Sequence, residues 1–189
     1  EGVRGACAEL GRRRKGELLM HSNCLGRVGC QKSHMKALRE GIRRNLTAFA
    51  VLEDDFEALG EAGKGGKLLE SVKDIQRNLP GWDAILLAGI TMASSRVFDS
   101  SKKGVPVNRI HACWLNTGVV VRGGYAPTLL KAFEDCDIFD GEKSIDYCWQ
   151  ELQARDRWYM PSPALGRQAA GKSDIDGYFK AWDKRSDTS

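Results

Sequence analysis

Three consecutive acids, Glu53, Asp54 and Asp55, are the residues of this chain best suited to chemistry, because they directly follow an apolar run, AFAVL at residues 48–52. Carboxylates crowded at the end of a strand repel one another, and a divalent cation would remove that repulsion. Ligands that are all oxygen favour a hard ion, Mg²⁺ or Mn²⁺, whose coordination is usually completed by substrate phosphates. The alternatives are an acidic turn in water and a helix N-terminus, where the helix dipole stabilises acids.

The elements that would position these acids are apolar strands alternating with helices. We expect strands at residues 48–52, 82–88, 118–122 and, as a last short strand, 157–160. We expect helices from a start near Gly29 or Ser33 to Arg44, and at residues 68–79, 125–133 and 144–154. Residues 89–108 and the chain after Pro163 are expected to form loops. This alternation is typical of an α/β sandwich with a mainly parallel sheet, in which ligands bind beyond the carboxyl ends of the strands.

The composition is that of a globular protein. The chain has 189 residues, of which 42% are hydrophobic and 29% charged, and this suits one domain with a buried core. No apolar run approaches the roughly 18 residues of a membrane span, and no N-terminal segment has the pattern of a signal peptide. Because the first residue is Glu1 rather than Met, we expect a trimmed, processed or partial chain. The compartment stays open: cytoplasmic for a bacterial or viral protein, the ER or Golgi lumen for a trimmed eukaryotic one.

Charge is spread unevenly along the chain. The first 45 residues hold eleven basic and four acidic residues, so this part carries +7 and the rest −3 of the net +4. A basic N-terminal part suits an anionic partner, such as a phosphate-bearing ligand or a nucleic acid. The alternative is a solvated helix face with no partner.

The cysteines do not form a recognisable zinc motif. No pair has CxxC spacing and no histidine has zinc-finger spacing, which argues against a structural zinc. Disulfides and small buried thiols both remain open for the six residues Cys7, Cys24, Cys30, Cys113, Cys136 and Cys148.

Residues 26–56, GRVGCQKSHMKALREGIRRNLTAFAVLEDDF, resemble the central part of glycosyltransferase family 25. This family includes bacterial lipooligosaccharide galactosyltransferases and the collagen galactosyltransferases. Its members show a Gly-Cys, then a Ser-His, then a helix, then an apolar strand that closes on Glu-Asp-Asp. The same order occurs here, with Gly-Cys at residues 29–30, Ser-His at 33–34 and Glu-Asp-Asp at 53–55. The helix and the apolar run lie between the Ser-His pair and the acidic triplet.

The resemblance continues downstream to about residue 176. The matching segments are LPGWDAILLAG at 79–89, TGVVVRGGYAPTLL at 117–130, SIDYCW at 144–149 and GRQAAGKSDID at 166–176. Residues 1–20 lack the strand with which the family usually opens, so the N-terminus is either truncated or built differently.

This resemblance implies a GT-A-type, Rossmann-like fold with a mixed, mostly parallel sheet flanked by helices, and a single glycosyltransferase domain over residues 1–189. It implies a UDP-sugar donor, Mn²⁺ or Mg²⁺ bridging the acids to the diphosphate, and transfer of a hexose, galactose above all, to a glycan or protein-linked hydroxyl with inversion. We expect a glycan or glycoprotein acceptor and no nucleic acid. The alternatives are a metal-dependent phosphoesterase or nuclease, and a non-catalytic nucleotide-sugar-binding domain.

The resemblance also assigns roles to acidic residues. Glu53, Asp54 and Asp55 would hold the metal, with Asp55 as the direct ligand and with Glu53 and Asp54 either ligating or holding the ribose and the metal waters. Asp146 would be the general base that deprotonates the acceptor; the alternative is a first-turn helix acid that stabilises the dipole. Asp83 is a weaker catalytic candidate, because an Asp before a strand is commonly a turn residue.

Five further residues are candidate donor-binding residues. Ser33 and His34 would lie at the floor of the pocket, although His34 also suits the apolar face of its helix as a core residue. Arg27 and Lys32, near the expected helix start, would meet the diphosphate, since a helix N-terminus attracts phosphate. Asp174 lies in a C-terminal element that would close over the donor and add a ligand.

Aromatic side chains are candidates for stacking on sugar rings. Core packing is the alternative for each of them. The four candidates are Trp114, Tyr125, Trp149 and Trp158.

Overall fold

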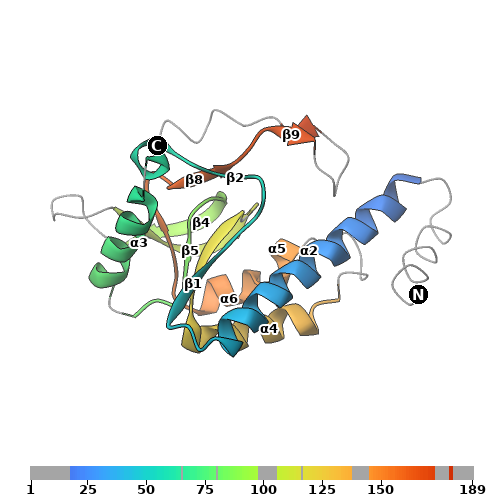
Figure 1. The fold of residues 1–189 in the computed structure, drawn as a ribbon, viewed down its shortest axis with the longest axis horizontal. Helices are drawn as coiled ribbons and strands as arrows, with labels where there is room; N and C mark the ends of the chain where they lie inside the picture. Colours follow the sequence, from blue (N-terminus) through green and yellow to red (C-terminus); the bar gives the residue numbers. More distant parts are fainter. Residues whose placement is uncertain are drawn as a thin grey trace.

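The computed structural model describes residues 18–64, 66–79, 81–97, 106–115, 117–137, 145–172 and 179–180, with side chains from residue 24 to 170 within those ranges. It is a mixed α/β structure with a six-stranded sheet in the order β1-β6-β3-β7-β5-β4 (Figure 1). The strands are β1 (Ala48–Leu52), β3 (Ala84–Leu86), β4 (Ile90–Arg96), β5 (Val107–Trp114), β6 (Gly118–Arg122) and β7 (Trp158–Pro161). Two small sheets pair β2 (Phe56–Ala58) with β8 (Gly166–Gln168) and β9 (Gly171–Lys172) with β10 (Phe179–Lys180).

The expectation of a mostly parallel sheet is wrong. Only β3 and β7 pair in parallel, and the other ladders of the six-stranded sheet are antiparallel. β6 inserts between β1 and β3 and runs opposite to both. Strand direction depends on which strands become neighbours, and the local pattern of apolar residues does not carry that information.

All four expected strands, and two of the four expected helices, form close to their expected bounds. The helices are α2 (Leu18–Arg43), α3 (Lys67–Asn78), α4 (Ala126–Asp135), α5 (Ile145–Cys148) and α6 (Gln150–Arg155). Short 3₁₀ turns occur at η1 (Gly60–Gly63) and η2 (Gly123–Tyr125). The helix expected over residues 144–154 is divided at Trp149.

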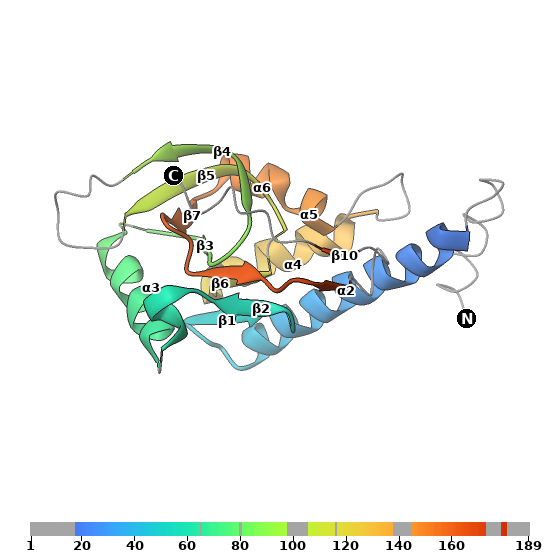
Figure 2. The same ribbon diagram turned by 90° about the horizontal axis from the view of Figure 1, so that it is seen from above.

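The expected start of the first helix is wrong, because α2 already includes Leu18 and passes through Gly29 and Ser33 without a break. A glycine inside a helix costs only about 1 kcal/mol relative to alanine, which tertiary packing easily outweighs. Gly41 serves a different purpose: a Cβ there would overlap the ring of Phe49, so glycine lets the end of α2 approach β1 closely. The N-terminal part of α2 extends beyond the sheet (Figure 2).

The expected loop over residues 89–108 instead contains all of β4 and the beginning of β5. β4 is an edge strand, exposed along its whole length, so its sequence lacks the apolar alternation that marks a half-buried strand. The chain after Pro163, for which the sequence predicts a loop, contributes β8, which pairs with β2 directly after the acidic residues.

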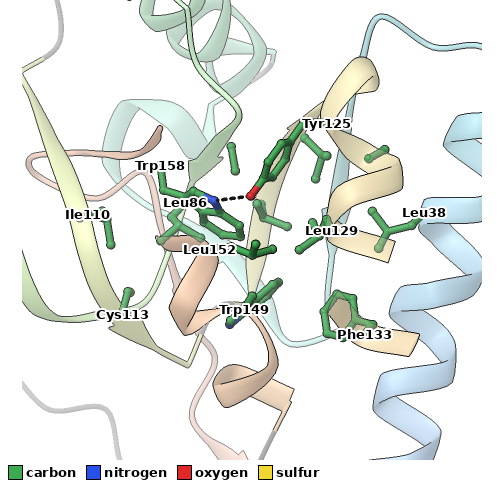
Figure 3. Close-up of a cluster of buried hydrophobic side chains, with 14 of the residues drawn as sticks. Leu38, Leu86, Ile110, Cys113, Tyr125, Leu129, Phe133, Trp149, Leu152 and Trp158 are labelled. Atoms are coloured by element: carbon green, nitrogen blue, oxygen red, sulfur yellow. Dashed lines mark hydrogen bonds between the residues drawn. The ribbon is translucent and has the colours of Figure 1, made fainter. Parts of the chain in front are cut away.

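Alternate residues of the central strands face opposite sides of the sheet and form two separate apolar clusters. On one side, Leu86 and Trp158 pack with α2, α4, α5 and α6 (Figure 3). Within this cluster the Trp158 indole N–H donates to the Tyr125 hydroxyl at 3.1 Å. On the other side, Ile85 and Tyr159 pack against α3. Helices therefore cover both faces of the sheet.

Disulfides and thiols both occur. Cys136, just after α4, is bonded to Cys148 at the end of α5, and Cys24 is also disulfide-bonded. Cys30 and Cys113 are outside disulfides. Among the described helices, none has both the length and the apolar character needed to cross a bilayer.

Candidate functional site

The acidic residues lie at the edge of the sheet where β1 and β3 end and β6 begins. Leu52 pairs with Gly118, and the Glu53 N–H donates to the carbonyl of Thr117 at 2.8 Å. The Leu87 N–H, just after β3, donates to the Gly118 carbonyl at the same edge. The acids are therefore positioned at the carboxyl end of a strand, as the sequence predicts.

Glu53 points towards α2. Its Oε1 lies 3.2 Å from Nε2 of His34 and 3.8 Å from Sγ of Cys30. His34 is 6% exposed, and its ring packs against Phe133 and Trp149 at centroid distances of 5.7 and 5.9 Å. His34 is thus a buried histidine whose ring nitrogen lies within hydrogen-bonding distance of the Glu53 carboxylate, which fits a core histidine; its place at the floor of a donor pocket stays a prediction.

Asp54 and Asp55 make no contact with His34 or Cys30 among the contacts found in the described residues. Asp54 is exposed, and the Asp55 carboxylate accepts a hydrogen bond of 2.8 Å from Nε2 of Gln168 on β8. The Asp55 carbonyl also accepts from the N–H of Ala169. Within the described residues, the one group of three metal-ligating side chains with ligand atoms mutually within 4.8 Å is Cys30, His34 and Glu53. The three consecutive acids therefore do not form a closed three-carboxylate cage.

Asp146 reaches the same edge from α5. Its Oδ2 accepts a hydrogen bond of 3.3 Å from the N–H of Leu115, in the short connection between β5 and β6 that also supplies the Thr117 carbonyl to Glu53. Leu115 has a φ of +55°, which turns the chain sharply there.

Burial, with a smaller contribution from the Asp146 charge, raises the pKa of the nearby Cys113 thiol to about 12. This cysteine therefore stays protonated at neutral pH.

One of the four candidate stacking residues is at this edge. Trp114, at the end of β5, is 40% exposed, and its ring lies 5.7 Å from that of Tyr147, which is 41% exposed. Tyr125, Trp149 and Trp158 are buried in the core. Tyr147 was not anticipated as a site residue; its place directly after Asp146 is the signal that would have suggested it.

Asp83 is at the opposite edge of the sheet, at the start of β3. Its side chain is 8% exposed and pairs with Arg122 at 2.6 Å and Arg157 at 3.1 Å, and it also accepts from the Arg157 N–H. Burial pushes the pKa of Asp83 up, but the hydrogen bonds and charges of these two arginines outweigh burial and hold the pKa below its ordinary value. We assign Asp83 a structural role in joining β3, β6 and the start of β7.

The remaining expected donor-binding residues lie along α2 or outside the described residues. Arg27 is half-buried, while Lys32 and Ser33 are exposed and lie in the interior of the helix. The helix N-terminus argument for Arg27 and Lys32 is therefore wrong, because interior backbone N–H groups are already hydrogen-bonded within the helix. Asp174 lies outside the described residues.

Besides Tyr147, the structure brings three further residues to the site. Cys30 contacts Glu53, Gln168 holds Asp55, and Thr117, 1% exposed, supplies its carbonyl to the Glu53 N–H. Cys30 had a detectable signal, because it precedes His34 by four residues and so shares its helix face. Gln168 and Thr117 are distant in sequence, and only the pairing of β2 with β8 and of β1 with β6 reveals them.

Comparison of the whole chain with models of known protein families finds no model that matches it, and comparison with curated proteins finds no significant match.

Proposed function

We propose that this chain is a metal-dependent glycosyltransferase that transfers a hexose, galactose above all, from a UDP donor to a glycan or protein-linked hydroxyl. The observation that supports this proposal best is a juxtaposition at one sheet edge. The acidic residues after β1 and Asp146 on α5 bind the same short connection, through the hydrogen bonds of Glu53 to Thr117 and of Leu115 to Asp146. Donor-side and acceptor-side carboxylates would then face one substrate complex.

On the donor side, the residues present fit a hard divalent ion. Mg²⁺ and Mn²⁺ are typically held by one or two carboxylates together with substrate phosphates, so a closed protein cage is not required. Asp55 would be the direct ligand, and its carboxylate is already oriented by Gln168. Asp54, exposed beside it, would ligate through water or contact the ribose. Glu53 faces α2, so we propose that it positions the acidic segment rather than ligating this ion.

Further donor contacts remain proposals. Arg27, Lys32 and Ser33 would approach the diphosphate or sugar from α2, and Asp174 would add a carboxylate from the C-terminal segment. The cation, when bound, supplies charge stabilisation for the leaving UDP.

On the acceptor side, Asp146 would take the proton of the attacking hydroxyl. A general base contributes about 10²–10⁴-fold to rate when it is correctly positioned, and the Leu115 N–H holds the Asp146 carboxylate at the sheet edge. Trp114 precedes Leu115 and Tyr147 follows Asp146 in the chain, and their exposed aromatic surface suits the C–H face of a sugar. Direct attack by the deprotonated hydroxyl would invert the anomeric carbon.

The test is release of UDP from UDP-galactose, measured with and without Mn²⁺ over a panel of glycan and glycopeptide acceptors. Mn²⁺-dependent release that rises with an acceptor supports the proposal. Hydrolysis of phosphodiesters without use of UDP-sugars would identify a phosphoesterase or nuclease. A melting-temperature increase with UDP and Mn²⁺, without any turnover across the panel, would identify a non-catalytic binding domain.

A further inference from the structure

We propose that Cys30, His34 and Glu53 bind a Zn²⁺-type transition-metal ion, at a site separate from the hard-ion site proposed for Asp54 and Asp55. Cys30 and His34 are four residues apart on α2 and therefore project from the same face of the helix. Glu53 reaches them from the end of β1. Their ligand atoms lie within 4.8 Å of one another.

Two of the three ligand-atom distances are close to those of a metal-bound set, and the third pair lies within 4.8 Å. Zinc lies about 2.3 Å from sulfur and about 2.0–2.1 Å from nitrogen or oxygen, so adjacent ligands of a tetrahedral zinc are about 3.3–3.5 Å apart. Here Glu53 Oε1 is 3.2 Å from His34 Nε2 and 3.8 Å from Cys30 Sγ. An ion would enter with small side-chain movements, and α2 and β1 would stay in place.

The surroundings favour a bound cation and allow it to enter. Phe133 and Trp149 fix the plane of the buried His34 ring, which reduces the entropy lost when the nitrogen is ligated. Cys30 is half-buried and the Glu53 side chain is 28% exposed, so the site opens to solvent on that side. On binding, the sulfur–hydrogen bond breaks, the sulfur bonds to the metal and the proton passes to water. Thiolate and carboxylate together then balance the double charge of the ion.

The chemistry of the ligands separates the two ions. A thiolate, an imidazole and one carboxylate favour Zn²⁺ or Co²⁺ over Mn²⁺ and Mg²⁺, whereas Asp54 and Asp55 offer only oxygen. Three protein ligands leave a fourth position for water. The sequence shows no zinc motif because the third ligand comes from another element, after β1.

The experiment uses the full chain with Co²⁺ as a spectroscopic probe. A cobalt–thiolate bond gives a charge-transfer band in the near ultraviolet, and tetrahedral coordination gives intense visible bands; Zn²⁺ should displace both. Cys30→Ser should abolish the charge-transfer band. Cys113→Ser, which removes the other cysteine that lies outside a disulfide among the described residues, should keep it. Absence of the band in the wild-type chain, or its retention in Cys30→Ser, overturns the proposal.

A second variant tests the site in case Cys30→Ser does not fold. Glu53→Gln keeps the size of the side chain and a hydrogen-bonding oxygen but removes the charge. Loss of a single outer-shell partner costs about 10–100-fold in metal affinity, so loss of a direct ligand should weaken Zn²⁺ binding at least tenfold. Unchanged Zn²⁺ affinity in a folded Glu53→Gln chain would overturn the assignment.

The outcome does not depend on the proposed transferase activity. Asp55→Asn should retain the cobalt spectrum while it loses Mn²⁺-dependent UDP binding. If no UDP-sugar binds but the cobalt spectrum appears, the Zn²⁺ site stands and the transferase proposal fails. If UDP-galactose is used with Mn²⁺ but the cobalt spectrum is absent, the transferase proposal stands and the Zn²⁺ proposal fails.

Discussion

His34 Nε2 and Glu53 Oε1 lie 3.2 Å apart, and this contact ties the long helix α2 to the end of the edge strand β1. The first of the three consecutive acids is therefore held against the helix, whereas the Asp55 carboxylate accepts a hydrogen bond from Gln168 on β8. Glu53 and Asp55 therefore have different partners, and Asp54 between them is exposed. This arrangement orients the acidic segment before any ion is bound.

Asp55→Asn should weaken Mn²⁺-dependent UDP binding at least tenfold, because it removes the proposed direct ligand while keeping a side chain that accepts from Gln168. Titration calorimetry with UDP, with and without Mn²⁺, measures this change. Asp74→Asn is the matched control: this half-buried acid on α3 accepts a hydrogen bond from Asn78 of the same helix, so the variant should bind UDP like the wild-type chain. Equal UDP affinity in Asp55→Asn and wild type would remove Asp55 from the metal site.

Asp146→Asn should lower the rate of hexose transfer about 10²–10⁴-fold and leave UDP binding unchanged, because the amide keeps an oxygen for the Leu115 N–H but cannot take a proton. The measurement is kcat with saturating UDP-galactose and acceptor. Asp83→Asn is the control: this carboxylate is at the other edge of the sheet, so its replacement should leave kcat near the wild-type value in the folded protein. A normal kcat in Asp146→Asn would exclude it as the base.

Asp83→Asn should instead destabilise the fold by about 1–3 kcal/mol, since it weakens the hydrogen bonds of a nearly buried carboxylate with Arg122 and Arg157. Denaturant unfolding measures the loss.

The same ion pairs predict a pH dependence. The pKa of Asp83 is lowered in the folded protein, so its contribution to stability is present above the ordinary aspartate pKa of about 3.9 and is lost as the pH falls through the lowered value. Between neutral pH and acid, the wild-type chain should therefore lose more stability than Asp83→Asn. If the free energy of unfolding changes with pH in the same way in both proteins, the ion pairs of Asp83 with Arg122 and Arg157 contribute nothing to the pH dependence of stability.

Trp114→Ala should raise the KM for acceptor about fivefold, corresponding to about 1 kcal/mol of stacking, without changing the affinity for UDP. Trp114 is exposed, so its removal should change stability by less than about 0.5 kcal/mol. Trp149→Ala removes an equally large ring that is 1% exposed, and it should cost about 3–5 kcal/mol in stability. An unchanged acceptor KM in Trp114→Ala would remove the stacking role.

The sequence by itself was enough to locate the strands β1, β3, β6 and β7 and the helices α3 and α4, because a packed face imposes a period on the residues that form it. It also located the acids at the carboxyl end of β1, since an apolar run that stops at charged residues marks the end of a strand. The sequence does not indicate the exposed edge strand β4, because this strand buries neither face and so lacks the alternation of apolar and polar residues.

Only the tertiary structure decided which side chains meet. The antiparallel insertion of β6 joins the connection after β5 to Glu53, and β8 brings Gln168 to Asp55. The same topology separates Asp83 from the acids that follow β1, although both flank strands in the sequence. Such contacts depend on the direction and order of strands, and these are set by packing between distant segments, which no local pattern encodes.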